Sequence, residues 1–158
     1  MGLAWTDNLS VGNAIIDSDH KKLITMINSA ECMIHKRDSF ALSQAFDQIE
    51  CWLHVHFSNE EIIAQAIGFS FVKNNLDHEY LLKTFRLIRD VIVGKNGVWD
   101  EGAAEHYSEF LSDWFTCHII REDMLMKPIL LTYPYNYKPI GAQAESVVTA
   151  WAGCDVAA

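Results

Sequence analysis

Histidine and carboxylate residues in this chain recur at spacings that could bind metal ions. In the segment WLHVHFSNEE, residues 52–61, His56 and Glu60 are four residues apart. On an α-helix this spacing turns the chain by about 400°, so the imidazole and the carboxylate lie one above the other on the same face. The two side chains could therefore reach one metal ion or two adjacent ones.

The pair falls on the apolar face of its segment. At about 100° per residue, four apolar residues lie within about 40° of His56, namely Leu42, Ile49, Ile63 and Ile67. A His–Glu pair on a helix is more often a surface hydrogen bond than a metal site. Two ionisable side chains on a core-facing stripe, however, need buried partners, and this favours metal ligation.

Four helices would position such residues. The first is predicted to start from a cap at Asp17, Ser18 or Asp19 and to run to about Lys36. The others are predicted at residues 40–67, 71–93 and 101–126, with caps at Ser39 and Asp100, a C-terminal glycine at Gly68 and a stop at Pro128.

Long helices joined by short turns predict an all-α fold, an antiparallel up-down-up-down four-helix bundle. We expect residues 1–127 to form this one domain, with an N-terminal arm at residues 1–17 that packs across the bundle through Trp5. Residues 128–158 form a C-terminal extension, which either packs on the bundle or begins a linker to an output domain. Gln143 to Trp151 could form a short helix within it.

The predicted topology brings more candidate ligands together. The starts of the first and third helices and the ends of the second and fourth lie at the same end of an antiparallel bundle. The candidates at this depth are His20, His56, Glu60, His78, His118 and Asp123. His118 and Asp123 are about 140° out of phase on a regular helix, so we expect a bulge or an irregular last turn between them.

Four imidazoles with two carboxylates suit a pair of first-row transition-metal ions, whereas tetrahedral zinc would need fewer ligands. The chain lacks HExxH, GxSxG and P-loop motifs and the Glu-x-x-His pairs of ferritin-like bundles. We expect the other polar residues near these helices to stay off the metal: His35, His54, His106 and Cys117, with Glu31 paired to a base or to water at the far end of the first helix.

Composition narrows the function further. The 158 residues carry a net charge of −9 without a basic cluster, which argues against nucleic acid as a partner. No apolar run approaches the ~20 residues of a membrane span, and no signal peptide is evident, so we expect a cytoplasmic protein with no membrane partner. The four cysteines are expected to be reduced and mostly buried.

The same residues resemble the hemerythrin family over about residues 5–127. The resemblance rests on Trp5, the LSVG at 9–12, His20 with the lysines that follow it, WLxxHFxxEE, HEYLLKTF at 78–85, and His118 to Asp123. It implies a non-haem di-iron site that binds O2 reversibly, with both carboxylates bridging the irons and an oxo, hydroxo or exogenous bridging ligand. It assigns His20 and His56 to one iron, and His78 and His118 to the other.

This chain departs from the family pattern at Asn74, where the third helix would carry another histidine. Asn74 could be a weak oxygen ligand, or it could leave the position to water or an exogenous anion. Greater solvent access should speed autoxidation, so we expect an O2 or redox sensor, such as the sensory part of a larger signalling protein like a diguanylate cyclase.

An O2 carrier or storage protein is the second hypothesis. A di-iron enzyme that reacts with peroxide or NO is the third, and a bundle that has lost its metal through the change at position 74 is the fourth. The sequence leaves all of these open.

Overall fold

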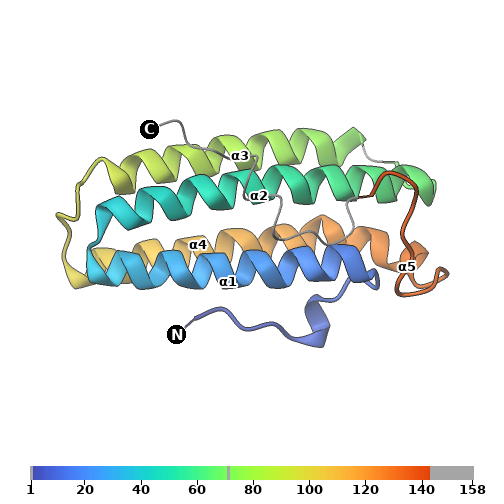
Figure 1. The fold of residues 1–158 in the computed structure, drawn as a ribbon, viewed down its shortest axis with the longest axis horizontal. Coiled ribbons are helices and arrows are strands. Elements are labelled where there is room, and N and C mark those ends of the chain that lie inside the picture. The colour runs from blue at the N-terminus through green and yellow to red at the C-terminus, as the bar shows by residue number, and fades with distance from the viewer. Residues whose placement is uncertain (1, 71, 143–158) are drawn as a thin grey trace.

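Four long antiparallel helices form the bundle (Figure 1). The computed structural model describes residues 2–70 and 72–142, and the side chains of residues 72–75 are not described. The four are α1 (Ala14–Lys36), α2 (Ser39–Ala66), α3 (Val72–Val93) and α4 (Glu101–Arg121), and α1 packs against α2 and α4 while α2 packs against α3. The described residues contain no strand, so the predicted all-α bundle is confirmed.

The first helix begins earlier than predicted. Its N-cap is Asn13, whose side-chain oxygen accepts hydrogen bonds from the backbone N–H groups of Ile15 and Ile16. Asp17 and Asp19, which were predicted as caps, lie inside the helix and are buried. The prediction was wrong because both carboxylates are used for tertiary contacts, and the arm therefore ends at residue 13.

Most other helix ends lie close to their predicted positions, but α4 ends at Arg121, five residues before the predicted end at Met126. Asp38, one residue before the predicted Ser39, caps α2 by accepting from the N–H of Ala41. Asp100 caps α4 as predicted, and Gly68 has the positive φ of a C-terminal glycine, 73°. The α1–α2 and α3–α4 turns meet at one end of the bundle and pack closely there. A Cβ atom on Gly97 would lie 2.6 Å from the carbonyl oxygen of Arg37.

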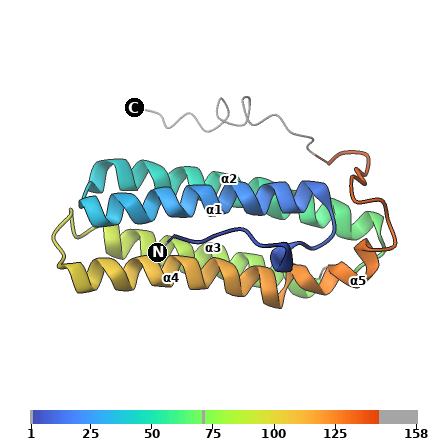
Figure 2. The same cartoon turned by 90° about the horizontal axis from the view of Figure 1, so that it is seen from below.

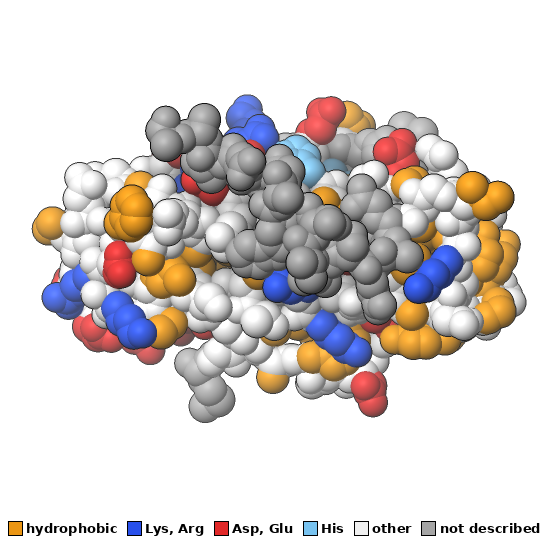
Figure 3. All heavy atoms as spheres, viewed as in Figure 1, with side chains coloured by type: hydrophobic (Ala, Val, Ile, Leu, Met, Phe, Trp, Pro, Cys, Tyr) orange, Lys and Arg blue, Asp and Glu red, His pale blue; other side chains and the backbone are white. Residues whose placement is uncertain are grey.

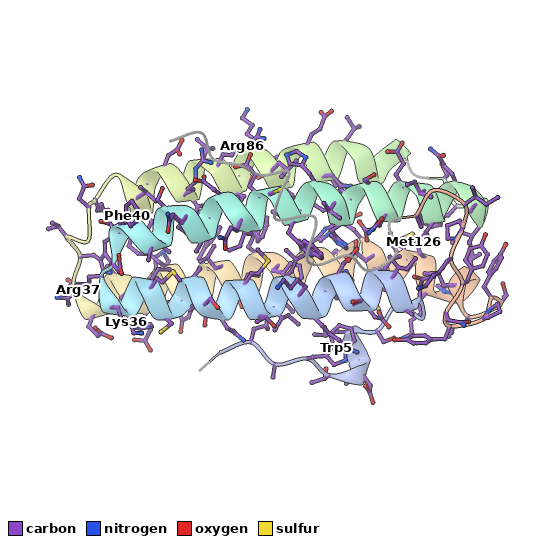
Figure 4. The ribbon with its side chains drawn as sticks, in the orientation of Figure 1. Trp5, Lys36, Arg37, Phe40, Arg86 and Met126 are labelled. Carbon is purple, nitrogen blue, oxygen red and sulfur yellow. The ribbon has the colours of Figure 1, made fainter. Side chains whose placement is uncertain are left out.

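The core follows the predicted apolar stripes. Leu42, Ile49, Ile63 and Ile67 are all buried. At the end of the bundle near Arg37 and Phe40 (Figure 4), the core is mainly apolar and includes Phe46 and Phe85, whose ring centroids lie 5.5 Å apart. The polar cluster described below lies in the other half of the bundle.

The N-terminal arm lies along the face formed by α1 and α4 (Figure 2). The backbone N–H of Leu3 donates to the side-chain oxygen of Asn28, and the amide of Asn28 donates back to the Leu3 carbonyl. Trp5 packs against the core, and its ring centroid lies 6.4 Å from that of His20. The predicted packing of the arm through Trp5 is confirmed.

The chain continues past α4 in short turns. The 3-10 helix η2 (Asp123–Met126) leads into α5 (Lys127–Leu130), in which Pro128 lies near the N-terminus. The prediction that Pro128 stops the helix was wrong, because proline is well tolerated in a first helical turn, where its missing N–H is not needed.

The described part of the extension packs on the end of the bundle. The N–H of Ala14 donates to the carbonyl of Tyr135, and the Asn13 amide donates to the carbonyl of Tyr137. Figure 3 shows apolar side chains gathered at this end, and Lys and Arg side chains scattered over the face in view. The predicted short helix at 143–151 lies outside the described residues.

The cysteines differ from the prediction. Cys32 and Cys117 are free but exposed, because both fall on outward faces of their helices. Cys51 is disulfide-bonded, and Cys154 lies outside the described residues. Within the described part of the chain, no helix is long and apolar enough to cross a membrane.

Candidate metal centre

All six predicted ligands meet in one buried cluster. Each is at most 5% exposed, and each comes from the depth at which the antiparallel topology placed it. His20 is on α1, His56 and Glu60 on α2, His78 on α3, His118 on α4, and Asp123 at the start of η2. Figure 4 shows Met126, three residues after the last of them, in the half of the bundle away from Arg37.

The cluster divides into two overlapping groups of four residues. One group is His20, His56, Glu60 and Asp123, and the other is Glu60, His78, His118 and Asp123; within each, the ligand atoms all lie within 4.8 Å of one another. Both groups contain both carboxylates. This is the arrangement expected of two adjacent ions that share bridging carboxylates.

Individual distances show how the carboxylates lie between the rings. Glu60 Oε2 lies 3.7 Å from His56 Nε2 and 3.2 Å from His78 Nε2. Asp123 points one oxygen, Oδ2, at His20 Nε2 at 3.0 Å and the other, Oδ1, at His118 Nε2 at 3.3 Å. Each carboxylate therefore faces one imidazole from each group.

Asp123 reaches the cluster because the helix changes form before it. The α-helix ends at Arg121, Glu122 adopts φ −113° and ψ −60°, and a 3-10 turn begins at Asp123. This turn brings Asp123 to the face that holds His118, which a regular α-helix would not do. A bulge or an irregular last turn was predicted between His118 and Asp123. The structure shows an irregular last turn.

The site residues fit a metal ion. Several of their buried atoms make no hydrogen bond within the described part of the chain, namely both ring nitrogens of His56 and His118, both oxygens of Glu60, and Oδ1 of Asp123. An unsatisfied buried polar atom costs about 1–3 kcal/mol. Coordination would satisfy these atoms together, and nitrogen with carboxylate oxygen is a donor set typical of iron and its neighbours.

The imidazoles are held in the form that binds metal. Burial lowers the pKa of His20 despite its hydrogen bond with Asp123. Burial, together with the neighbouring His118, lowers the pKa of His78 to about 3, and burial lowers the pKa of His118 to about 4. These three rings are therefore neutral at pH 7, with a lone pair available.

The two carboxyl groups differ. Burial, reinforced by the charge of Asp123, raises the pKa of Glu60 well above its usual value. Burial acts on Asp123 in the same direction, but the charge of His118 and the hydrogen bond from His20 outweigh it and lower the pKa of Asp123. A metal ion between the two carboxyl groups would favour the ionised form of each.

Aromatic side chains fix the rings from outside. Phe57 stacks on His78 with centroids 3.8 Å apart and planes 10° apart, and its edge meets His118 at 5.5 Å. Phe115 meets His20 edge-on at 6.0 Å. These contacts restrict ring rotation, which favours a site formed before metal enters.

The other histidines lie away from the cluster. His35, His54 and His106 are exposed and belong to neither group. Glu31 was expected to pair with a base or water, but it accepts a hydrogen bond from the hydroxyl of Ser112. The side chain of Asn74 lies outside the described residues, so its predicted role is untested by the structure.

Sequence reasoning missed two polar residues next to the cluster. Asp19, considered only as a helix cap, lies 3.8 Å from His56 Nδ1, and Asn59 donates to the same carboxylate. The available signal was their position, since Asp19 directly precedes His20 and Asn59 directly precedes Glu60.

The fold and the cluster define a class of protein, a four-helix bundle with a buried histidine and carboxylate site for metal ions. The family model described as the hemerythrin HHE cation binding domain matches residues 11–130. The chain therefore belongs to the hemerythrin family, whose members bind a di-iron centre and O2.

Curated relatives agree with this assignment. A bacteriohemerythrin of Pseudomonas aeruginosa is 25% identical over 122 residues, 77% of this chain and 76% of the relative. A hemerythrin-like protein of Naegleria gruberi is 27% identical over 126 residues, 80% of this chain and 92% of the relative. A bacteriohemerythrin of Aquifex aeolicus is 25% identical over 114 residues. A search of solved structures finds no significant match.

Proposed function

We propose that the six clustered residues hold two iron ions. His20 and His56 bind one iron, His78 and His118 bind the other, and Glu60 and Asp123 bridge them. The observation that supports this most strongly is the overlap of the two four-residue groups in both carboxylates. When bound, a pair of ferrous ions supplies the two electrons that reversible O2 binding requires.

We further propose that the domain is a cytoplasmic O2 or redox sensor. The support is Asn74, which stands where the family pattern has a histidine on the third helix. With one fewer imidazole, the iron near His78 should be more open to water and small anions. Greater solvent access should speed autoxidation of the iron site. Rapid autoxidation suits a sensor better than an O2-storage protein.

A sensor also needs an output, and the extension offers a route to one. Asp123 begins η2, whose Met126 packs in the same buried cluster as Leu130 of α5. The residues that follow contact the start of α1 through Tyr135 and Tyr137. A shift of Asp123 could therefore reach the extension and any signalling module, such as a diguanylate cyclase, fused beyond it.

Two alternatives use the same site. An O2 carrier or storage protein would keep its oxygenated form for hours. A di-iron enzyme would turn over peroxide or NO with a reductant, using the position that Asn74 leaves open.

The deciding experiment is an absorption spectrum with iron counted per chain, recorded as purified, after dithionite and after return to air. Near-ultraviolet charge-transfer bands with two irons, bleached by dithionite and regained in air, are expected. An oxygenated form that decays within minutes would support sensing, and one that lasts for hours would support carriage. Absence of iron after growth in ample iron would refute the ligand assignment.

A further inference from the structure

Cys51, in the middle of α2, is disulfide-bonded. The chain has four cysteines, and two of them, Cys32 and Cys117, are free. The cysteine left to be the partner of Cys51 is Cys154, four residues before the end of the chain. The bond would therefore connect the C-terminal extension to α2, far from the end of the bundle on which the described part of the extension packs.

Cys51 begins an apolar stripe on the outer side of α2. Val55 and Ile62 follow it by four and eleven residues, so the three lie within about 40° of one another, and all are partly exposed. The stripe lies about 60° from Asn59, which bonds to α1, and about 120° from Glu50, which bonds to α3. It therefore lies on the α1 side of α2.

Apolar side chains of α1 continue this surface. Met26 and Met33 lie within about 40° of Asp19, the α1 residue that bonds to Asn59 of α2. Both methionines are partly buried and pack against the core. The outer α1–α2 face is thus lined by Met26, Met33, Cys51, Val55 and Ile62.

The sequence of the extension matches an apolar face of this kind. In the predicted short helix at 143–151, the apolar residues Ala144, Val147, Val148 and Trp151 follow the i, i+3, i+4, i+7 pattern of one helix face. Ser146 and Thr149 fall on the opposite face. A helix this short is not stable alone in water, so its apolar face needs a surface to cover it.

The length of the extension also fits. Ala142, the last described residue, packs against the apolar cluster that includes Ile63 and Ile67 of α2. Figure 2 shows the chain after α5 crossing the end of the bundle toward α1 and α2. From Ile63 or Ile67 back to Cys51 is about 18–24 Å along the helix. A helix at 143–151 spans about 14 Å, and residues 152–154, if extended, add about 10 Å.

We propose that residues 143–151 dock as a short helix on the outer α1–α2 face, and that a Cys51–Cys154 disulfide holds them there until it is reduced. An external dithiol opens this latch: its two sulfurs join in a disulfide, the Cys51–Cys154 bond breaks, and each cysteine sulfur takes up a proton. Disulfides in the cytoplasm are usually transient and redox-sensing. The inference goes beyond the proposed iron site and does not depend on it.

The first test identifies the bond in the full chain. Oxidised protein should show two free thiols when denatured, and four after reduction. Trypsin cleaves after Lys and Arg but not before Pro, so a digest without reductant should contain residues 38–73 joined to residues 122–158. Four free thiols in protein equilibrated with oxidised dithiothreitol, or a different partner for Cys51, would overturn the inference. Neither result depends on iron content.

The second test asks whether the extension docks. Val147→Asp places a charge on the apolar face of the predicted helix, which should lower the effective concentration of Cys154 at Cys51. The disulfide should then open at a ratio of reduced to oxidised dithiothreitol about tenfold lower than in wild type, a shift of about 30 mV for two electrons.

Ser146→Asp is the matched control, because it adds the same charge to the opposite face one residue away, and it should open at the wild-type ratio. Thiols are counted across the titration after quenching with acid. If the disulfide forms but the two variants open at the same ratio, docking on the outer α1–α2 face is overturned.

Discussion

The Nε2 atom of His20 lies 3.0 Å from the Oδ2 atom of Asp123, although the two residues are 103 positions apart in the chain. His20 lies in the second turn of α1, and Asp123 lies just past the end of α4. This fully buried contact can form only when the first and last helices pack together. The cluster is therefore a product of the complete bundle.

Replacement of a ligand should remove iron. His118→Ala deletes an imidazole from the second group, so iron should fall from two per chain to one or less. His106→Ala, an exposed histidine on the same helix, should retain two. Iron is counted by a colorimetric chelator assay after gel filtration, and an equal iron content in the two variants would contradict the assignment of His118.

Restoration of the family histidine should slow autoxidation. Asn74→His would return an imidazole to the iron near His78 and exclude water, so the oxygenated form should decay at least about tenfold more slowly, by analogy with other changes around metal sites. Decay is followed by absorbance in air. Lys83→Gln, a change at an exposed position on the same helix, serves as the control. If Asn74→His decays at the same rate as this control, position 74 does not face the metals.

The metal-free protein should lose stability in acid. His78 and His118 have folded-state pKa values of about 3 and about 4, below the unfolded value near 6.5. Between these limits the unfolded chain binds more protons, so stability is full above about pH 6.5 and falls as the pH drops. At pH 5 the loss from His118 alone is about 2 kcal/mol.

Urea unfolding of metal-free protein between pH 7 and pH 4.5 measures this loss, with His118→Gln expected to show a shallower pH dependence. Glu60 acts in the opposite direction, because its raised pKa favours the folded state at lower pH. Stability that stayed level from pH 7 to pH 4.5 in both proteins would show that the histidines are not neutralised by burial. In the iron-loaded protein, the same protons compete with metal, and iron should be released in acid.

The first helix should depend on Asn13 more than an ordinary helix depends on its cap. Asn13→Ala removes the bonds to Ile15 and Ile16 and also the donor to the Tyr137 carbonyl. The cap alone is worth about 1 kcal/mol, and the lost bond to Tyr137 adds about 1 kcal/mol. Asp38→Ala, which removes the exposed cap of α2, should cost about half as much; equal losses in urea unfolding would argue that the extension does not stabilise the bundle.

Helical phase and topology were enough to predict the cluster. His56 and Glu60 share a face with Ile49 and Ile63 at any plausible helix boundary, so an error of a residue or two at a helix end does not move them. The same reasoning identified Asp123 as out of phase and required an irregular turn. It could not say which turn, because α-helical, 3-10 and bulged geometries differ little in sequence preference.

Errors arose where one residue type has two uses. Aspartate is a preferred cap, yet Asp17 accepts hydrogen bonds from Ser10 and from the N–H of Val11, and so ties the arm to α1. Asp19 faces His56 for an equally non-local reason. Local preference cannot separate these uses, because the partners come from other parts of the chain.

The apolar half of the bundle also has a consequence for what the protein can carry. There the indole N–H of Trp99 donates to the carbonyl of Ile34 at 3.0 Å, and Phe46 and Phe85 pack edge to face without touching a ligand. The packing in this half stabilises the fold independently of metal coordination. A zinc finger differs, because its folding depends on binding its ion. Manganese or cobalt should therefore replace iron without refolding the chain, and such a substituted protein would allow the coordination to be studied without oxidation chemistry.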